Sequence, residues 1–245
     1  MCDPVSEPAA DPRWGQRDRD IKARAIAQTV RHYMSLPLDQ ADCVDVGCGS
    51  GGIAFHLAPL VRSMVGVDPE SWQRWKDYQN QRKNLRFLQE SVESLSIPDA
   101  SVDVVICNQV YEHVPDPKRL IQEIHRILKP GGYCYFAGPN LLFPIEPHIF
   151  WPFVHWLPRD LAIGLIRLVG SRAVLDANST SYWTLRRWLA GFEIRNAIPH
   201  IIKHPEMYDR TGLVFRAASR IPKRFLSFLT FLSPGFIFVL RKPGE

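Results

Sequence analysis

The feature that most constrains this chain is a glycine cluster placed between a short apolar run and a helical pattern. The run Cys43–Val46 is followed by glycines within 47–52, and apolar residues then recur at helical spacing from Ile53 to Ala58. Glycine lets a backbone turn tightly and approach a ligand, and the first turn of a helix favours negative charge. The cluster therefore predicts a strand, a ligand-binding turn and a helix.

The remaining apolar runs repeat this alternation. Further strands are expected over 64–67, 85–88, 102–107 and 133–137, and helices over 17–36, 71–82 and 118–128. After Gly138 the pattern resumes only with a helix over 182–190 and two strands over 192–198 and 235–240. Such alternation predicts one α/β domain over 17–245, with a parallel sheet covered on both faces, behind a loose tail at 1–16.

Asp45 narrows the range of ligands that the glycine turn could bind. Gly47, Gly49 and Gly52 fit the pattern GxGxxG, which alone is compatible with a dinucleotide. A carboxylate two residues before the first glycine repels a pyrophosphate but attracts an ammonium group. The expected ligand therefore has a cationic end beside Asp45 and an anionic end at the turn amides. Taken alone, Asp45 could equally cap the turn that follows it.

Four motifs, in the correct order, resemble those of the class I S-adenosylmethionine-dependent methyltransferases, and of their type 11-like group in particular. They are Asp45–Gly52, Val65–Pro69, Pro98–Val114 and Leu128–Gly132. The resemblance covers 17–137 well and the last helix and strands loosely. It implies a doubly wound, Rossmann-like, seven-stranded sheet and S-adenosyl-L-methionine as cofactor, since the aminoacyl part of this donor carries both an ammonium and a carboxylate.

The resemblance also implies which residues touch the donor. Asp68 would accept from both ribose hydroxyls, although an aspartate before a proline is also a common turn residue. Ser91 would stand where the family commonly has an aspartate, and its hydroxyl can still accept one hydrogen bond from the adenine. The implied donor site comprises Asp45, Gly47, Cys48, Gly49, Gly51, Asp68, Pro69, Ser91, Val92, Asn108 and Gln109. Cys48 is expected to fill space rather than act as a nucleophile, and Asp103 to support its loop.

The sequence says less about which residues would act on the methyl acceptor. A sulfonium methyl group is already electrophilic, so a general base is needed only where the acceptor must lose a proton. Candidates near the expected mouth of the site are Tyr111, His113, Glu146, His148 and Tyr182. We predict His148, His113 and Tyr111 as catalytic, with His148 first because it follows the fifth strand. A structural hydrogen-bonding role is the alternative for each histidine, and Glu112–His113 could brace its loop.

The segment 139–181 predicts a substrate lid inserted after the fifth strand. Its aromatic residues favour an apolar or planar acceptor. Apolar residues over 161–169 predict a helix that either packs on the sheet, as we expect, or lies on a membrane surface. Arg216, Arg220, Lys223 and Arg224 stand beside apolar residues and would attract anionic lipids. The expected partner is thus a small-molecule or lipid-like substrate, with peripheral membrane contact.

Composition excludes several classes. The chain has 245 residues, 46% of them hydrophobic and 22% charged, which is typical of a globular protein, and its formal charge of +5 falls short of a nucleic-acid signature. Five scattered cysteines indicate reduced thiols without a disulfide framework or a metal site. No secretory signal and no membrane-spanning run is predicted. We therefore expect a cytoplasmic protein that can associate with a membrane.

Three functions remain open at this point. The first is methyl transfer from S-adenosylmethionine to a small or lipid-like acceptor, at oxygen in preference to carbon or nitrogen. The second is a catalytically silent protein with the same fold that acts at a membrane or in a complex. The third is an NAD-dependent oxidoreductase, which the charge of Asp45 disfavours.

Overall fold

The computed structural model describes residues 16–145, 151–168, 179–210 and 212–244, so the predicted tail at 1–16 lies almost wholly outside the described residues. Within them, seven strands form one sheet in the order β3-β2-β1-β4-β5-β7-β6. The strands are β1 (Asp42–Val46), β2 (Ser63–Asp68), β3 (Leu85–Gln89), β4 (Val102–Asn108), β5 (Leu128–Pro139), β6 (Glu193–Asn196) and β7 (Gly235–Arg241). The doubly wound α/β fold predicted from the sequence is confirmed.

The sheet is mixed, which corrects the prediction of a purely parallel one. Strands β1 to β5 pair in parallel, as alternation with helices requires. In contrast, β7 runs antiparallel to both β5 and β6. Pairing Pro139 with Gly235 places the start of β7 beside the end of β5. Apolar periodicity does not show this direction, because a buried strand has the same pattern of apolar residues whether it runs parallel or antiparallel to its neighbours.

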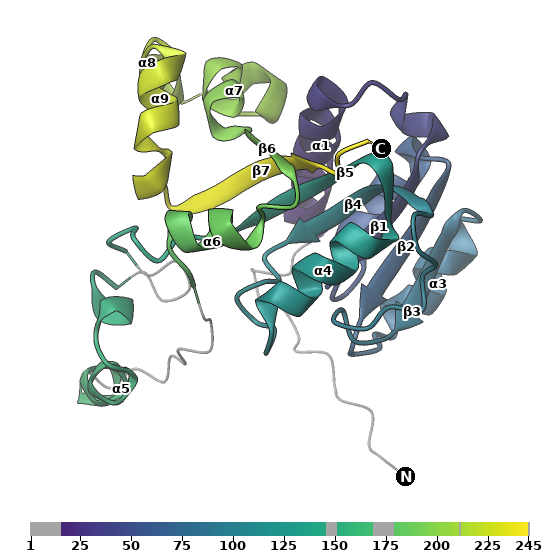
Figure 1. The fold of residues 1–245 in the computed structure, drawn as a ribbon, viewed down its shortest axis with the longest axis horizontal. Coiled ribbons are helices and arrows are strands. Elements are labelled where there is room, and N and C mark those ends of the chain that lie inside the picture. Colours follow the sequence, from purple (N-terminus) through teal and green to yellow (C-terminus); the bar gives the residue numbers. More distant parts are fainter. Residues whose placement is uncertain (1–15, 146–150, 169–178, 211, 245) are drawn as a thin grey trace.

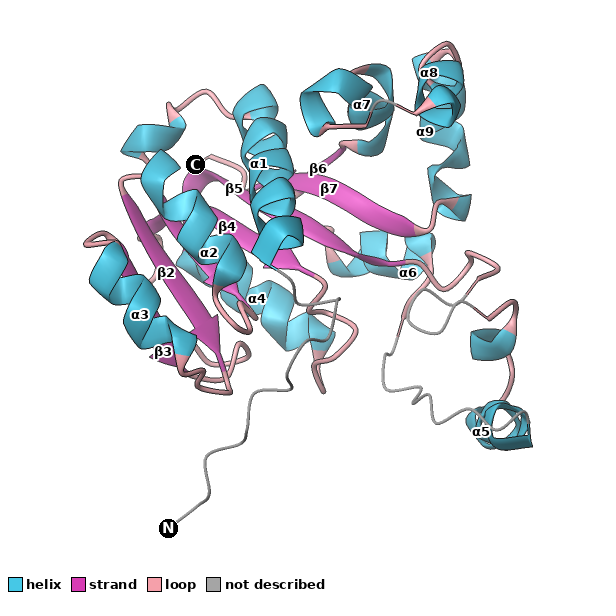
Figure 2. Ribbon diagram, turned by 180° about the vertical axis from the view of Figure 1, so that it is seen from behind, coloured by secondary structure: helices cyan, strands magenta, loops and turns pink. Residues whose placement is uncertain are grey.

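Two layers of helices cover the sheet. Figure 2 shows α1 (Gln16–Tyr33), α2 (Gly52–Leu57) and α3 (Arg74–Gln81) on one face. Figure 1 shows α4 (Pro117–Ile127) and α6 (Tyr182–Trp188) on the other. Each face has its own apolar cluster, one around α4 and α6 and one around α1 and α2. This double cover explains why β1 and β4 read as near-continuous apolar runs.

The segment after β5 does not pack on the sheet as we expected. Helix α5 (Arg159–Leu168) buries Ala162 and Ile166 against Val154 and Trp151, in a small cluster separate from the main core. Figure 1 shows α5 away from the sheet. The turn before α5 buries Ala162 and Ile166, which lie four residues apart on one side of the helix. The apolar pattern of α5 is therefore explained without contact with the sheet. Much of the predicted lid, at 146–150 and 169–178, lies outside the described residues.

Three further short helices lie beyond the β7–β6 edge, where the sequence predicted no regular structure. They are α7 (Ile198–Lys203), α8 (Leu213–Ala218) and α9 (Lys223–Leu229), joined to β7 by the 3-10 turn Thr230–Leu232. Each is shorter than the window in which helical periodicity becomes clear. No helix in the described part of the chain is long and apolar enough to cross a membrane.

Candidate functional site

The glycine turn follows β1 and is fixed to the neighbouring strand. The amides of Gly47 and Cys48 both donate to the carbonyl of Val67, at 2.8 and 3.0 Å. Gly47 has a φ of +68°, and a Cβ built there would lie 2.6 Å from a methyl carbon of Val110. A side chain at this position would therefore meet both backbone strain and a clash. The turn brings the exits of β1, β2 and β4 together.

Asp45 is the buried carboxyl of the site. Burial raises its pKa to about 7, although the charge of Arg19 and the Ala54 backbone amide oppose the shift. The Ala54 contact supports the capping interpretation for one oxygen. Oδ2 nevertheless has no hydrogen-bond partner among the described residues. A buried carboxylate oxygen without a partner is costly, and a cationic ligand would satisfy it. Asp45 therefore fits an ammonium group, which supports the electrostatic prediction.

Asp68 ends β2 and faces the glycine turn. Its Oδ2 accepts from the amide of Gly49 at 2.8 Å and its Oδ1 from the amide of Glu70 at 3.0 Å. Burial raises the pKa of Asp68, and these two amides act in the opposite direction. Each carboxylate oxygen has two lone pairs, so both keep acceptor capacity for a diol. Nearby, the carbonyl of Pro69 accepts from the amide group of Gln89.

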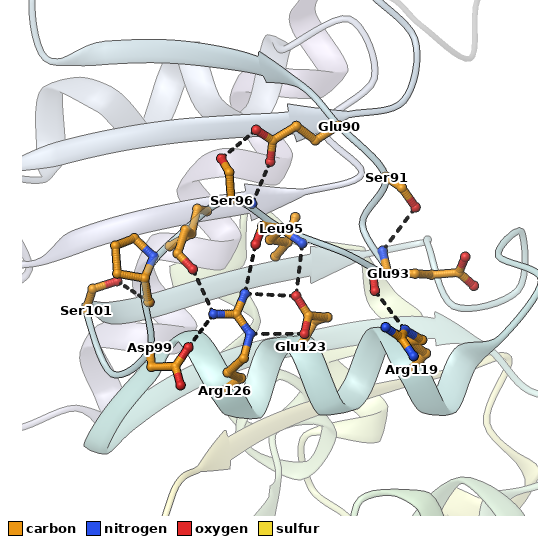
Figure 3. Close-up of polar contacts among 12 residues, drawn as sticks. Glu90, Ser91, Glu93, Leu95, Ser96, Asp99, Ser101, Arg119, Glu123 and Arg126 are labelled. Carbon is orange, nitrogen blue, oxygen red and sulfur yellow. Dashed lines mark hydrogen bonds and ion pairs between the residues drawn. The ribbon is translucent and has the colours of Figure 1, made fainter.

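The loop over 89–101 carries the predicted adenine residues. Val92 is buried, whereas Ser91 is exposed and its Oγ accepts from the amide of Glu93 at 3.3 Å. Figure 3 shows this loop lying along α4, which contacts it through Arg119, Glu123 and Arg126. Ser91 is therefore at the surface of a loop whose shape is fixed from the other side.

Arg126 is the main contact between α4 and that loop. Its guanidinium donates to the carbonyls of Leu95 and Ile97, at 2.9 and 2.8 Å, and pairs with Asp99 and Glu123 (Figure 3). The carboxylates of Glu123 and Asp99 raise the pKa of Arg126, because they stabilise the charged guanidinium. The sequence analysis missed this role, because residues about 30 positions apart give no local signal.

The exit of β4 provides the next part of the site. Asn108 is the last residue of the strand and is half-buried, and Gln109 follows in a left-handed conformation with φ +59°. The amide of Gln109 donates to the carbonyl of Ala137 at 2.8 Å. A left-handed glutamine is uncommon and marks a backbone held by its surroundings. The backbone after β4 is therefore held beside the end of β5, and contact of Asn108 and Gln109 with the donor stays a prediction.

The predicted catalytic residues differ in their surroundings. Tyr111 is fully buried, and its hydroxyl donates to the carbonyl of Pro139 and accepts from the amide of Thr180 at 3.4 Å. Burial raises the pKa of Tyr111. These contacts favour a role in joining loops. His113, in contrast, has an exposed side chain whose Nε2 lies 4.0 Å from Oε1 of the buried Glu112.

The structure says less about the other residues predicted to lie near the methyl acceptor. His148 and Glu146 lie outside the described residues. Tyr182 is half-buried at the start of α6, packs on the core and accepts from Arg186 at 3.1 Å. A catalytic role for any of the predicted residues stays a prediction.

Several residues with structural roles were anticipated, and one more was missed besides Arg126. Cys48 is buried against Gly66, and Cys43, Cys48, Cys107 and Cys134 are free thiols, as expected. Asp103 binds the amide of Asp42 and the ammonium of Lys129 at the opposite edge of the sheet. The missed residue is Arg19, on α1, which lies over Gly52 and acts electrostatically on Asp45. Among the described residues, no group of three or more His, Cys, Asp or Glu side chains could hold a metal.

Comparison with known proteins agrees with this geometry. Residues 44–136 match the family described as a methyltransferase domain. The uncharacterized methyltransferase YcgJ of Bacillus subtilis is 28% identical over 168 residues, 63% of this chain and 65% of the relative. A ubiquinone biosynthesis O-methyltransferase of Albidiferax ferrireducens is 34% identical over 109 residues, 42% of this chain and 43% of the relative. These alignments thus span less than two thirds of either relative.

A solved structure extends the likeness to the whole sheet. The phosphoethanolamine N-methyltransferase 2 of Haemonchus contortus, in complex with phosphomonomethylethanolamine and S-adenosylhomocysteine, superimposes with a TM-score of 0.56 at 14% identity. The match covers 90% of this chain and 52% of that one. Residues 44–136 therefore match a methyltransferase domain, and the solved structure shows that the chain shares the fold of that enzyme.

Proposed function

We propose that this protein transfers a methyl group from S-adenosylmethionine to a small or lipid-like acceptor, at oxygen. The observation that carries the proposal is the pairing of a buried Asp45, one of whose oxygens has no partner among the described residues, with a turn in which Gly47 and Gly51 have positive φ and no space for a side chain. An amino acid zwitterion matches this arrangement, whereas a pyrophosphate does not. When bound, the donor supplies an electrophilic methyl group.

The chain's own residues then have separate tasks. Asp45 holds the ammonium, Asp68 the ribose hydroxyls, and Ser91 with Val92 the adenine. Asn108 and Gln109 position the methionine part at the exit of β4. The loops after β4 and β5 align the acceptor and exclude water, which is the main requirement when the methyl group is already activated.

Transfer at oxygen needs a proton acceptor near the crevice. We propose His148 for this role from its place in the sequence after β5, with His113 as the described alternative, because the Glu112 carboxylate beside it would stabilise an imidazolium. The relative named as an O-methyltransferase supports oxygen as the accepting atom. His148→Ala should slow turnover more than it weakens donor binding, with His204→Ala as an exposed control. Equal turnover would make His148 structural.

Titration with S-adenosylhomocysteine tests the donor site without requiring turnover. Asp68→Ala should weaken binding by about 1.5 to 3 kcal/mol, the range for hydrogen bonds to a charged group. The control Asp103→Ala removes a carboxyl from the opposite edge of the sheet, so its affinity should stay at the wild-type value. Unchanged affinity for Asp68→Ala would remove Asp68 from the ribose site.

The pH dependence of that titration tests Asp45. Only the carboxylate attracts an ammonium, so affinity should fall as pH drops below about 7, the raised pKa of Asp45 in the free protein. At pH values well below this pKa, the expected slope is about tenfold per pH unit. Asp45→Asn should bind weakly at every pH and lose the slope. A flat profile in the wild type would contradict the proposed contact.

Two alternatives predict different outcomes. Binding of NAD without binding of S-adenosylhomocysteine would favour an oxidoreductase. Donor binding without transfer of labelled methyl groups to any lipid or small-molecule extract would favour a catalytically silent protein. A labelled product from such an extract would establish methyl transfer and identify the acceptor.

A further inference from the structure

Helix α9 and the turn after it present an apolar stripe to solvent. Leu226 and Thr230, four residues apart, face the protein, where Thr230 Oγ1 accepts from the side-chain amide of Asn196 at 2.6 Å. The outward positions are occupied by large apolar side chains at spacings of three and four residues: Phe225, Phe228, Leu229 and Leu232. Phe228 is 69% exposed. A helix whose outer face is this apolar is normally covered by something.

Helix α8 continues the same surface. Leu213 and Val214 are 82% and 78% exposed, among the most exposed large apolar residues of the described chain. We call the exposed apolar residues of α8, α9 and the turn at 230–232, together with the basic residues among them, the α8–α9 surface. It lies at the same end of the long axis as α5, which also exposes leucines (Figure 1).

The charge of the α8–α9 surface has one sign. No aspartate or glutamate occurs between residues 210 and 244. Arg216, Arg220, Lys223 and Arg224 are all exposed, and no carboxylate of the described chain forms an ion pair with any of them. Basic side chains can extend from an apolar face while their charged groups stay in water. The surface therefore combines a strip of apolar side chains with four cations available to an external anion.

The α8–α9 surface is continuous with the acceptor side of the site. The ring of Phe228 lies 5.7 Å from that of Phe231, which lies 5.7 Å from the ring of Trp183 at the start of α6. Asn140, directly after β5, donates through its side-chain amide to the carbonyls of Phe231 and Ser233, at 2.8 and 2.9 Å. The surface thus begins where the parallel strands end, at the edge that forms the crevice.

We propose that the α8–α9 surface docks this protein on an anionic lipid bilayer. Apolar side chains would enter the boundary between headgroups and acyl chains, and the four cations would meet the lipid phosphates. A nucleic acid would match the cations but leave the phenylalanines and leucines in water. A second copy of the chain, paired symmetrically, would bring like charges together. The biological role of this docking rests on the proposed function, because a lipid-like acceptor would be reached at the bilayer.

Vesicle flotation of the full chain tests docking without any methyl donor. The probes are phosphatidylcholine vesicles with and without one third phosphatidylglycerol, at about 0.1 M and 0.5 M salt, where screening differs strongly. We expect about tenfold more bound protein on the anionic vesicles at low salt, and loss of this difference at high salt. Equal binding to both vesicles, or binding to neither, would overturn the proposal.

Matched variants locate the contact. Lys223→Glu with Arg224→Glu should reduce binding about tenfold or more, whereas Lys76→Glu with Lys83→Glu, the same charge change on exposed residues at α3, should not. Leu229→Ser should reduce binding several-fold and Leu36→Ser should leave it unchanged. Equal behaviour of a variant and its control would overturn the assignment to this surface.

Two further measurements keep the outcomes separate. Titration with S-adenosylhomocysteine shows that each variant is folded, and a protein that floats but binds no donor would refute the proposed function while leaving docking intact. Sedimentation velocity without lipid detects self-association. A dimer that Leu229→Ser dissociates would overturn the proposal in favour of a second copy as the occupant.

Discussion

The two halves of the molecule treat apolar side chains in opposite ways. Between Leu36 and Ile145, a stretch the structure describes completely, no large apolar side chain is strongly exposed. From Ile145 onward such side chains recur on α5, α8 and α9. The first half, which contains the glycine turn, is a closed core that can hold a ligand in one geometry. The second half shares the core through α6 and β7 but also has an open apolar surface that only another molecule would bury.

A pair of phenylalanines gives the largest test of this contrast. Phe136 on β5 is fully buried and Phe228 on α9 is largely exposed. Phe136→Ala should lower the free energy of unfolding by about 3 to 5 kcal/mol, because it opens a cavity in a packed core. Phe228→Ala should change it by less than about 0.5 kcal/mol in the absence of a partner. Urea unfolding measures both. A large loss for Phe228→Ala would show that the second half is also a closed core.

The glycine turn should tolerate the smallest addition poorly. Gly47→Ala introduces a methyl group at positive φ against Val110, so S-adenosylhomocysteine should bind about 1 to 3 kcal/mol more weakly. Gly131→Ala is the control, because that glycine also has positive φ but its nearest neighbour is 3.8 Å away, at the other end of the sheet. Calorimetric titration compares them. Wild-type affinity in Gly47→Ala would mean that the turn is less rigid than its contacts indicate.

The next effect concerns the loop over 89–101. Arg126→Met removes the donors to two carbonyls of that loop, and we expect a loss of about 1 to 3 kcal/mol in stability with a smaller loss in donor affinity. Arg119→Met removes a single contact to Glu93 and should have the milder effect of the two. Thermal unfolding and donor titration separate stability from binding. Equal effects of the two substitutions would contradict the central place of Arg126.

The smallest expected effect lies where the two halves meet. The ring of His200 on α7 stacks on that of His32 on α1, 3.6 Å between centroids, and burial lowers the pKa of His200 to about 4. The unfolded chain, with a histidine pKa near 6.5, then binds more protons than the folded one between about pH 6.5 and 4. The contribution of His200 to stability should therefore be constant above pH 6.5 and fall as the pH drops toward 4, whereas Asp45, whose pKa is raised, contributes in the opposite direction.

His200→Gln should remove this contribution, so its stability at pH 5 relative to pH 7.5 should be higher than that of the wild type. Its remaining pH dependence should reflect other histidines with lowered pKa values, such as His32 and His125, together with the raised pKa of Asp45, which acts in the opposite direction. Urea midpoints at pH 7.5 and pH 5 give the comparison. A slope as steep as in the wild type would assign the pH dependence elsewhere.

The same contrast explains how far the sequence could be interpreted. In the first half, local patterns predicted the strands and placed Asp45 and Asp68 at adjoining strand ends, because carboxyl ends of parallel strands meet at one edge. Arg19 and Arg126 were missed, since each acts on residues far along the chain. In the second half the outward stripe of α9 has the same spacing as an inward one. The helix itself, only seven residues long, was not predicted, and periodicity alone does not show which side of it faces the protein.

Asn140 joins three distant stretches of chain at the exit of β5. Besides its contacts with Phe231 and Ser233, its Oδ1 accepts from the amide of Leu142, and its backbone forms a bridge with Thr180. A displacement of α9 would therefore strain or break hydrogen bonds that also hold the backbone directly after β5. One buried carboxamide therefore couples the position of α9 to that of the backbone at the end of β5.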